Sequence, residues 1–155
     1  MKEVEMFVKL LMPDTTAITT FHTLENMGFK SLKKLERLDY YKFSVEDNVN
    51  LEEFKNKISK VDVLVNANKH KASFVLPEAK NDMFKVVTQS IENDAEGLLG
   101  VLRNRLNFKD VAKMEKGVLW VFTIKNDSKE ESSKKAEEMT KSLLINRHYQ
   151  KYRMV

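Results

Sequence analysis

Residues 29–36 read Phe-Lys-Ser-Leu-Lys-Lys-Leu-Glu, and residues 108–115 read Phe-Lys-Asp-Val-Ala-Lys-Met-Glu. The two stretches share one order of apolar and charged positions at a spacing of roughly eighty residues, a period typical of an internal repeat. The flanking segments match in the same way: 41–46 with 120–125, and 64–66 with 144–146. The sequence therefore predicts two copies of one structural unit in a single chain.

The boundary between the copies is predicted from a short polar segment. Residues 77–82 read Pro-Glu-Ala-Lys-Asn-Asp, a composition typical of a linker. We therefore expect a first repeat at residues 1–76, a linker at 77–82 and a second repeat at 83–155.

Hydrophobic periodicity predicts the elements of each repeat. The first repeat reads as strand 4–10, helix 15–27, strands 32–38 and 40–46, a helix that follows Asn50, and a last strand that ends near residue 76. The second reads as strand 84–90, helix 95–106, strands 111–116 and 118–125, helix 130–145 and strand 149–154. Asp14 is expected to cap the first helix, and Gly28 to end it.

These elements give an α+β fold class. It comprises two tandem β-α-β-β-α-β (ferredoxin-like) units with antiparallel sheets, which form an intrachain pseudo-dimer. Both faces of strand 118–125 are apolar, with Trp120 and Phe122 on one face and Leu119 and Val121 on the other. Because helices cover only one face of such a sheet, we expect the two sheets of the chain to bury each other.

Composition excludes several classes of protein. The chain has 155 residues, of which 42% are hydrophobic and 32% charged, as in a folded globular protein. It contains no cysteine, which excludes disulfides and cysteine-ligated metals. No apolar run is long enough for a transmembrane helix, and the charged start Met1–Glu5 predicts a strand rather than a signal peptide. We expect a cytoplasmic protein without membrane contact.

The sequence offers little for catalysis. Its three histidines, His22, His70 and His148, lack metal-ligand spacing, and no glycine-rich phosphate loop occurs. The acidic residues of the last helix alternate with lysines, which predicts a solvated face. We therefore expect no catalytic residue, no cofactor and no metal site, and no activity of the chain alone.

Residues 116–122, Lys-Gly-Val-Leu-Trp-Val-Phe, partly match the aromatic strand motif of RNA-recognition domains. That motif requires exposed aromatic rings at the third and fifth positions, and only Trp120 is aromatic here. Nucleic-acid binding is accordingly the less favoured interpretation, and a structural Trp120 packed between sheets is the favoured one.

Three segments resemble the PurS family, the small subunit of phosphoribosylformylglycinamidine synthase: residues 4–10, residues 23–29 (Thr-Leu-Glu-Asn-Met-Gly-Phe) and residues 136–146. The last of these is similar to the family's second helix, which ends in Leu-Leu-x-Asn. The family's long loop after the first strand is absent from both repeats.

The resemblance implies a non-catalytic accessory subunit of an ATP-dependent amidotransferase in purine biosynthesis. Such a subunit bridges synthetase (PurL-type) and glutaminase (PurQ-type) chains, and a tandem chain would be a covalent pseudo-dimer that could dimerise further. Candidate partner-interface residues are Trp120, Tyr41, Asp14 and Asp94. An ACT-like small-molecule-binding regulatory module is the alternative, because residues 93–99 resemble the ACT ligand loop.

Overall fold

The computed structural model describes residues 1–78, 80–125 and 127–155. Residue 79, inside the predicted linker, lies outside this described part. The first repeat contains β1 (Lys2–Leu10), α1 (Thr15–Asn26), β2 (Leu32–Val45), α2 (Leu51–Ile58) and β3 (His70–Ser73). The second contains β4 (Met83–Ser90), α3 (Glu96–Asn104), β5 (Val111–Ile124), α4 (Lys129–Met139), the π-helical turn η1 (Thr140–Leu144) and β6 (Gln150–Met154).

The strands form an antiparallel sheet in the order β3-β1-β2-β5-β4-β6. Strand β1 pairs with β2 from Lys2 opposite Val45 to Val8 opposite Asp39. Strand β4 pairs with β5 from Met83 opposite Thr123 to Thr88 opposite Val118. This confirms the predicted α+β class. The expectation of two sheets that bury each other is wrong, because the strands join one sheet.

The two longest strands differ from the sequence prediction. We expected two strands at 32–38 and 40–46, but β2 is continuous over 14 residues, and β5 is equally long. A tight hairpin turn needs residues at positive φ, which Asn-Gly or Gly pairs supply. Leu38-Asp39 contains no such residue, and Gly117 does not adopt positive φ; within the described residues, Asn107 and Gly28 do. Each predicted pair of strands is therefore one strand.

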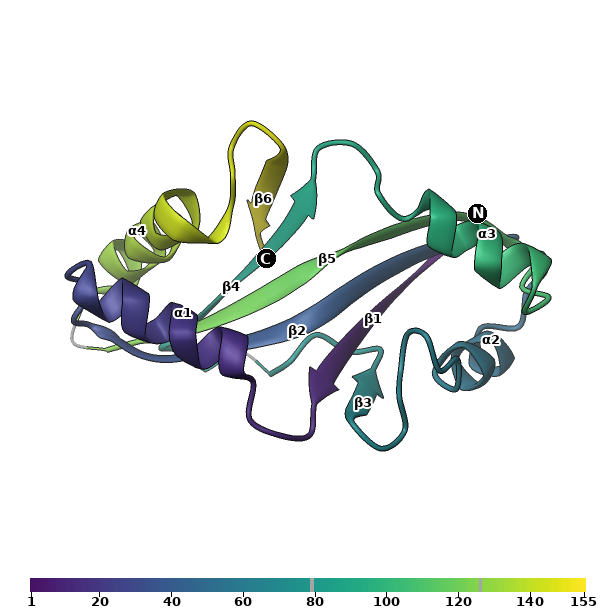
Figure 1. Cartoon of the computed structure of the whole chain (residues 1–155), viewed down its shortest axis with the longest axis horizontal. Helices are drawn as coiled ribbons and strands as arrows, with labels where there is room; N and C mark the ends of the chain where they lie inside the picture. Colours follow the sequence, from purple (N-terminus) through teal and green to yellow (C-terminus); the bar gives the residue numbers. More distant parts are fainter. Residues whose placement is uncertain (79, 126) are drawn as a thin grey trace. The chain divides into compact units, whose positions relative to one another are not determined.

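The chain divides into two compact units that combine elements of both repeats (Figure 1). Unit 1 comprises residues 1–12, 39–76 and 92–117, and unit 2 comprises residues 13–38, 77–91 and 118–155. The divisions within β2 and β5 fall where the two hairpin turns were expected. Each unit thus holds the strands and helices of one β-α-β-β-α-β unit, with a helix and half a strand supplied by the other repeat.

The hydrophobic core of unit 1 unites both repeats. Its β1 residues Val4, Met6 and Val8 cluster with Leu102 of α3 and Met114 of β5, and all five are less than 5% exposed. Phe54 of α2 stacks edge-on against Phe108, with ring centroids 6.1 Å apart. Unit 1 therefore needs the second repeat to bury the first repeat's strands.

The core of unit 2 is built in the same way. Leu24 of α1 clusters with Ala136 and Met139 of α4, and these two helices cover the same face of the sheet (Figure 1). Beneath them lie Trp120 and Phe122 of β5. Unit 2 therefore needs α1 of the first repeat to bury the second repeat's strands.

Local sequence accounts for the helix ends. Asp14 accepts a hydrogen bond from the backbone N–H of Ala17, and Ser128 accepts one from Glu131, as their N-cap positions predict. Gly28 follows the end of α1 and has a φ of 106°, a backbone conformation that favours glycine. Helix α4 ends at Met139, earlier than predicted, because the chain continues as the π-helical turn η1.

Candidate partner-binding residues

Trp120 lies in the core of unit 2. Its side chain is 7% exposed and clusters with Leu24 of α1 and Met139 of α4. The indole therefore packs between sheet and helices, not between two sheets. Because an RNA-stacking aromatic must be exposed, this burial also argues against the RNA-recognition interpretation of residues 116–122.

Tyr41, which aligns with Trp120, lies in unit 1 at the margin of the core. It is half-buried and stacks against Phe43, with ring centroids 6.4 Å apart. Burial, and secondarily the negative charge of Asp39, raises the pKa of the Tyr41 phenol to about 12. The ring therefore stays neutral at physiological pH.

Asp14 has two roles in unit 2. One carboxylate oxygen caps α1 through Ala17, and the carboxylate also accepts two hydrogen bonds from Arg37, at 2.9 and 3.1 Å. Only 15% of the Asp14 side chain is exposed. This arrangement holds the start of α1 to strand β2, and Arg37 was not singled out from the sequence.

Asp94 occupies the matching position in unit 1, but with different contacts. Its carboxylate lies 4.0 Å from the ammonium of Lys116, and 48% of its side chain is exposed. No side chain caps α3; instead Asn93, just before the helix, accepts from the Ala95 N–H and donates to the Met114 carbonyl. The start of α3 is therefore held by an amide rather than by a buried ion pair.

The four candidate residues are thus divided between the two units. Each of the four side chains contacts other residues of its own unit rather than another of the four candidates. Their assignment to a partner interface stays a prediction, and Asp94 is the most accessible of the four.

The histidines have ordinary structural surroundings. His70 accepts a hydrogen bond from the backbone N–H of Asn66, while His22 is exposed and lies 4.0 Å from Glu25. His148 stacks edge-on against Tyr149, with centroids 6.4 Å apart. Within the described residues, no three His, Asp or Glu side chains gather closely enough to hold a metal ion.

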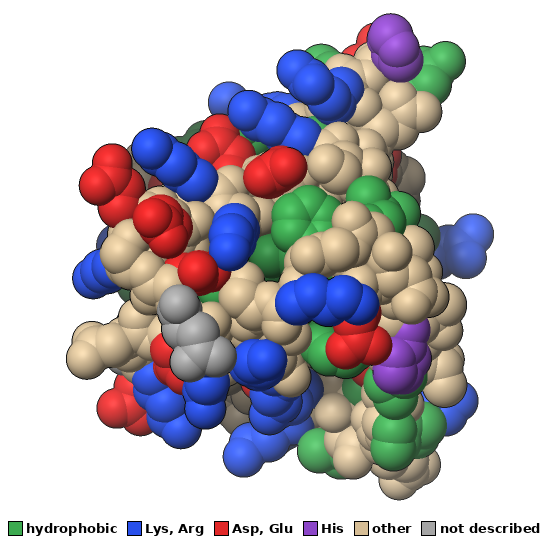
Figure 2. Space-filling view, turned by 90° about the vertical axis from the view of Figure 1, so that its left-hand side faces the viewer, with side chains coloured by type: hydrophobic (Ala, Val, Ile, Leu, Met, Phe, Trp, Pro, Cys, Tyr) green, Lys and Arg blue, Asp and Glu red, His purple; other side chains and the backbone are tan. Residues whose placement is uncertain are grey.

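Charged side chains cover much of the face of unit 2 that Figure 2 shows, where basic and acidic groups are interspersed. On α4, Lys134 pairs with Glu130 and Lys141 pairs with Glu137. The Tyr152 hydroxyl donates to Glu137, which lowers the pKa of that carboxyl and raises the pKa of the Tyr152 phenol. This pattern fits the solvated helix face expected from the sequence.

The glycine of the ACT-like segment has no packing requirement. A Cβ at Gly97 would meet no atom within 4 Å, so glycine is not needed there for close approach of the protein's own backbone. A polar pocket of about 400 Å³ lies elsewhere in unit 1, beside the start of α2, and Asn50, Glu53, Lys57 and Asn107 help to line it. These features give the ACT-like alternative no specific support.

Comparison with known protein families identifies a similarity in the second repeat. Residues 91–155 match the family model PurS, phosphoribosylformylglycinamidine (FGAM) synthase. The matched segment lies within the second repeat, which is therefore PurS-like. No curated protein matches the chain. No helix in the described parts of the chain has the length and apolar character needed to span a membrane.

Proposed function

We propose that this chain is a non-catalytic structural subunit of a phosphoribosylformylglycinamidine synthase complex. In this role it bridges a synthetase (PurL-type) chain and a glutaminase (PurQ-type) chain during purine biosynthesis, in the cytoplasm. The observation that carries the proposal is the match of residues 91–155 to the PurS family.

The differences between the two units support a bridging role. Two compact units of one design occur in a single chain, yet equivalent positions carry different side chains. The largely buried ion pair of Asp14 with Arg37 in one unit is replaced by the more exposed pair of Asp94 with Lys116 in the other. A bridge requires two unlike surfaces, and divergence after duplication supplies them.

Reconstitution tests the proposal. The purified chain is mixed with the synthetase and glutaminase chains of the same organism in the presence of glutamine and ADP–Mg²⁺, and the mixture is fractionated by size. We expect the three chains to elute together, and glutamine-dependent FGAM formation to require this chain. Separate elution, with full activity in its absence, would sink the proposal.

A ligand screen separates the proposal from the ACT-like alternative. A regulatory module gains stability when a specific amino acid binds, since a ligand that binds only the folded state raises the melting temperature. The structural-subunit proposal expects no such shift with any of the twenty amino acids. A specific, saturable shift with one of them would favour the alternative.

A further inference from the structure

Two loops of this protein share one backbone design. The first covers residues 66–70 and precedes β3, and the second covers residues 146–150 and precedes β6. We call them the Lys69 loop and the Tyr149 loop. Each begins with an asparagine whose side-chain oxygen accepts from the N–H two residues later, at 3.0 Å in the Lys69 loop and 3.1 Å in the Tyr149 loop.

The remaining hydrogen bonds of the loops also match. The Asn66 carbonyl accepts from Lys69 and His70, and the Asn146 carbonyl accepts from Tyr149 and Gln150. The Asn66 N–H donates to His70, as the Asn146 N–H donates to Gln150. Each loop is also tied to the end of the unit's first strand, by Leu11 to Lys69 and by Ile91 to Tyr149, at 2.8 Å in both cases.

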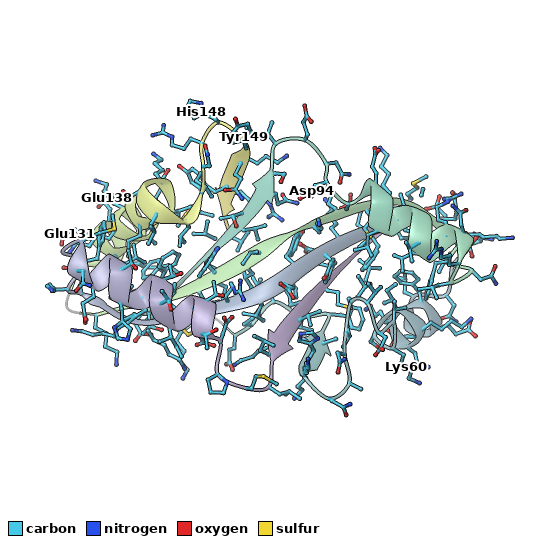
Figure 3. The ribbon with its side chains drawn as sticks, in the orientation of Figure 1. Lys60, Asp94, Glu131, Glu138, His148 and Tyr149 are labelled. Atoms are coloured by element: carbon cyan, nitrogen blue, oxygen red, sulfur yellow. The ribbon has the colours of Figure 1, made fainter. Side chains whose placement is uncertain are left out.

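The loops differ in the side chains that they display and in their last residue, which is His70 in one and Gln150 in the other. The Lys69 loop presents Ala67, Asn68 and Lys69, and the Tyr149 loop presents Arg147, His148 and Tyr149 at the same three exposed positions. Tyr149 is 72% exposed, although its ring is large and largely apolar. Figure 3 shows His148 and Tyr149 at the tip of the loop before β6.

These side chains have the character of a protein-binding hot spot. Tyrosine and arginine are the residue types that most often dominate binding energy, and a rigid loop loses little entropy when it docks. The exposed Ile91, 52% accessible, adjoins the loop through its backbone bond to Tyr149. Since the Lys69 loop shows that the backbone needs none of the three side chains, the fold does not explain their presence.

The surrounding charge defines the partner's chemistry. Arg147 lies in the loop and Lys151 and Arg153 follow it, whereas Lys141 is already paired with Glu137 and the acidic Glu92 follows Ile91, so positive charges outnumber negative ones along these segments. A partner that docks here needs carboxylates around an apolar recess that accepts the Tyr149 ring, because opposite charges steer association and set its register.

We propose that the Tyr149 loop is the contact site for an acidic surface of the synthetase chain. The inference rests on the proposed function. A partner within the synthase complex is chosen because the segment similar to FGAM synthase, residues 91–155, contains both Ile91 and the whole Tyr149 loop but not the Lys69 loop. Within that complex we commit to the synthetase chain, and the glutaminase chain is the alternative that the binding test separates.

The two loops supply a matched variant for the test. Arg147→Ala, His148→Asn and Tyr149→Lys together place the Lys69-loop residues on the Tyr149 loop, a combination that the same backbone already carries. The control is Lys69→Ala in the other loop. Binding of each full-length protein to the purified, nuclease-treated synthetase and glutaminase chains is measured separately, by titration with glutamine and ADP–Mg²⁺ present.

The triple variant is expected to bind the synthetase at least about tenfold more weakly, with unchanged melting temperature, while Lys69→Ala binds like wild type. Wild-type affinity of the triple variant, or an equal loss in Lys69→Ala, overturns the inference and leaves the proposed function standing. So does a loss confined to the glutaminase, or wild-type binding that disappears after nuclease treatment. If wild type binds neither chain, the proposed function itself fails.

Discussion

The backbone N–H of Lys125 donates to the carbonyl oxygen of Ser31 at 3.0 Å, and the N–H of Glu46 donates to that of Asp110 at 3.1 Å. In both bonds, the end of a long strand from one repeat meets the loop between helix and strand of the other. The two repeats therefore complete each other twice, once in each compact unit.

This exchange predicts the behaviour of the separated halves. A fragment of residues 1–76 and a fragment of residues 83–155 each lack half of both cores, so neither should fold as a monomer. When the two are co-expressed, they should purify as a one-to-one complex with the circular dichroism spectrum of the intact chain. Gel filtration with light scattering, together with thermal melts, checks the stoichiometry and the folding.

A tethered pair should also be more stable than the separate pair. The linker makes association intramolecular at an effective concentration of about 1 mM, so the melting temperature of the two-fragment complex should depend on concentration while that of the intact chain does not. A single fragment that melts cooperatively as a monomer would contradict this interpretation of the exchange.

Leu102 tests the dependence of one repeat on the other within unit 1. This α3 side chain is fully buried against strands of the first repeat, so Leu102→Ala should destabilise unit 1 by about 2–5 kcal/mol. Amide hydrogen exchange should accelerate in β1, which is distant from Leu102 in the sequence but packs in the same core. It should accelerate less in β4, which belongs to unit 2. The control Leu106→Ala, at a position 43% exposed, should change stability by less than about 0.5 kcal/mol.

Asp14 allows its two roles to be separated. Asp14→Ala removes both the cap of α1 and the partner of the half-buried Arg37, and should cost about 1–3 kcal/mol of unfolding free energy. Asp14→Asn keeps a good capping side chain but removes the charge, so it should cost less. In the exposed pair, Asp94→Ala should cost under about 1 kcal/mol. Equal effects of the two alanine variants in urea unfolding would show that burial of the pair is unimportant.

The sequence predicted the fold class and the capping residues Asp14 and Ser128, because each depends on local periodicity or on side chains a few positions apart. The hairpin turns were mispredicted because two short alternating strands and one long strand produce the same pattern. The signal that could have decided was the lack of glycine or asparagine at Leu38-Asp39.

The exchange between repeats and the contrast between the two loops depend on long-range pairing. Arg37 reaches Asp14 across 23 positions, and Ile91 reaches Tyr149 across a still longer separation. The periodicity of a single sequence cannot predict which residues so far apart form hydrogen bonds with each other. The alignment of Asn66 with Asn146 was visible in the sequence. Only the matched hydrogen bonds show that the two loops share one backbone conformation, so that their displayed side chains can be compared position by position.

Tyr41 gives the protein a specific response to alkaline pH. Its pKa, raised to about 12 by burial and then by Asp39, exceeds the value of about 10 for an unfolded tyrosine. The unfolded chain therefore releases this proton first, so the stabilisation is fully present below about pH 10 and is lost as the pH rises toward 12. After allowance for partial exposure, the loss should reach about 1–2 kcal/mol.

Tyr41→Phe isolates this contribution, because phenylalanine keeps the ring and removes the ionisable group. Urea unfolding is measured from about pH 8 to about pH 11 for wild type, Tyr41→Phe and the exposed control Tyr149→Phe. The wild type and Tyr149→Phe should lose stability in parallel above about pH 10, whereas Tyr41→Phe should lose less. Three parallel curves would show that the Tyr41 phenol ionises as readily in the folded protein as in the unfolded chain.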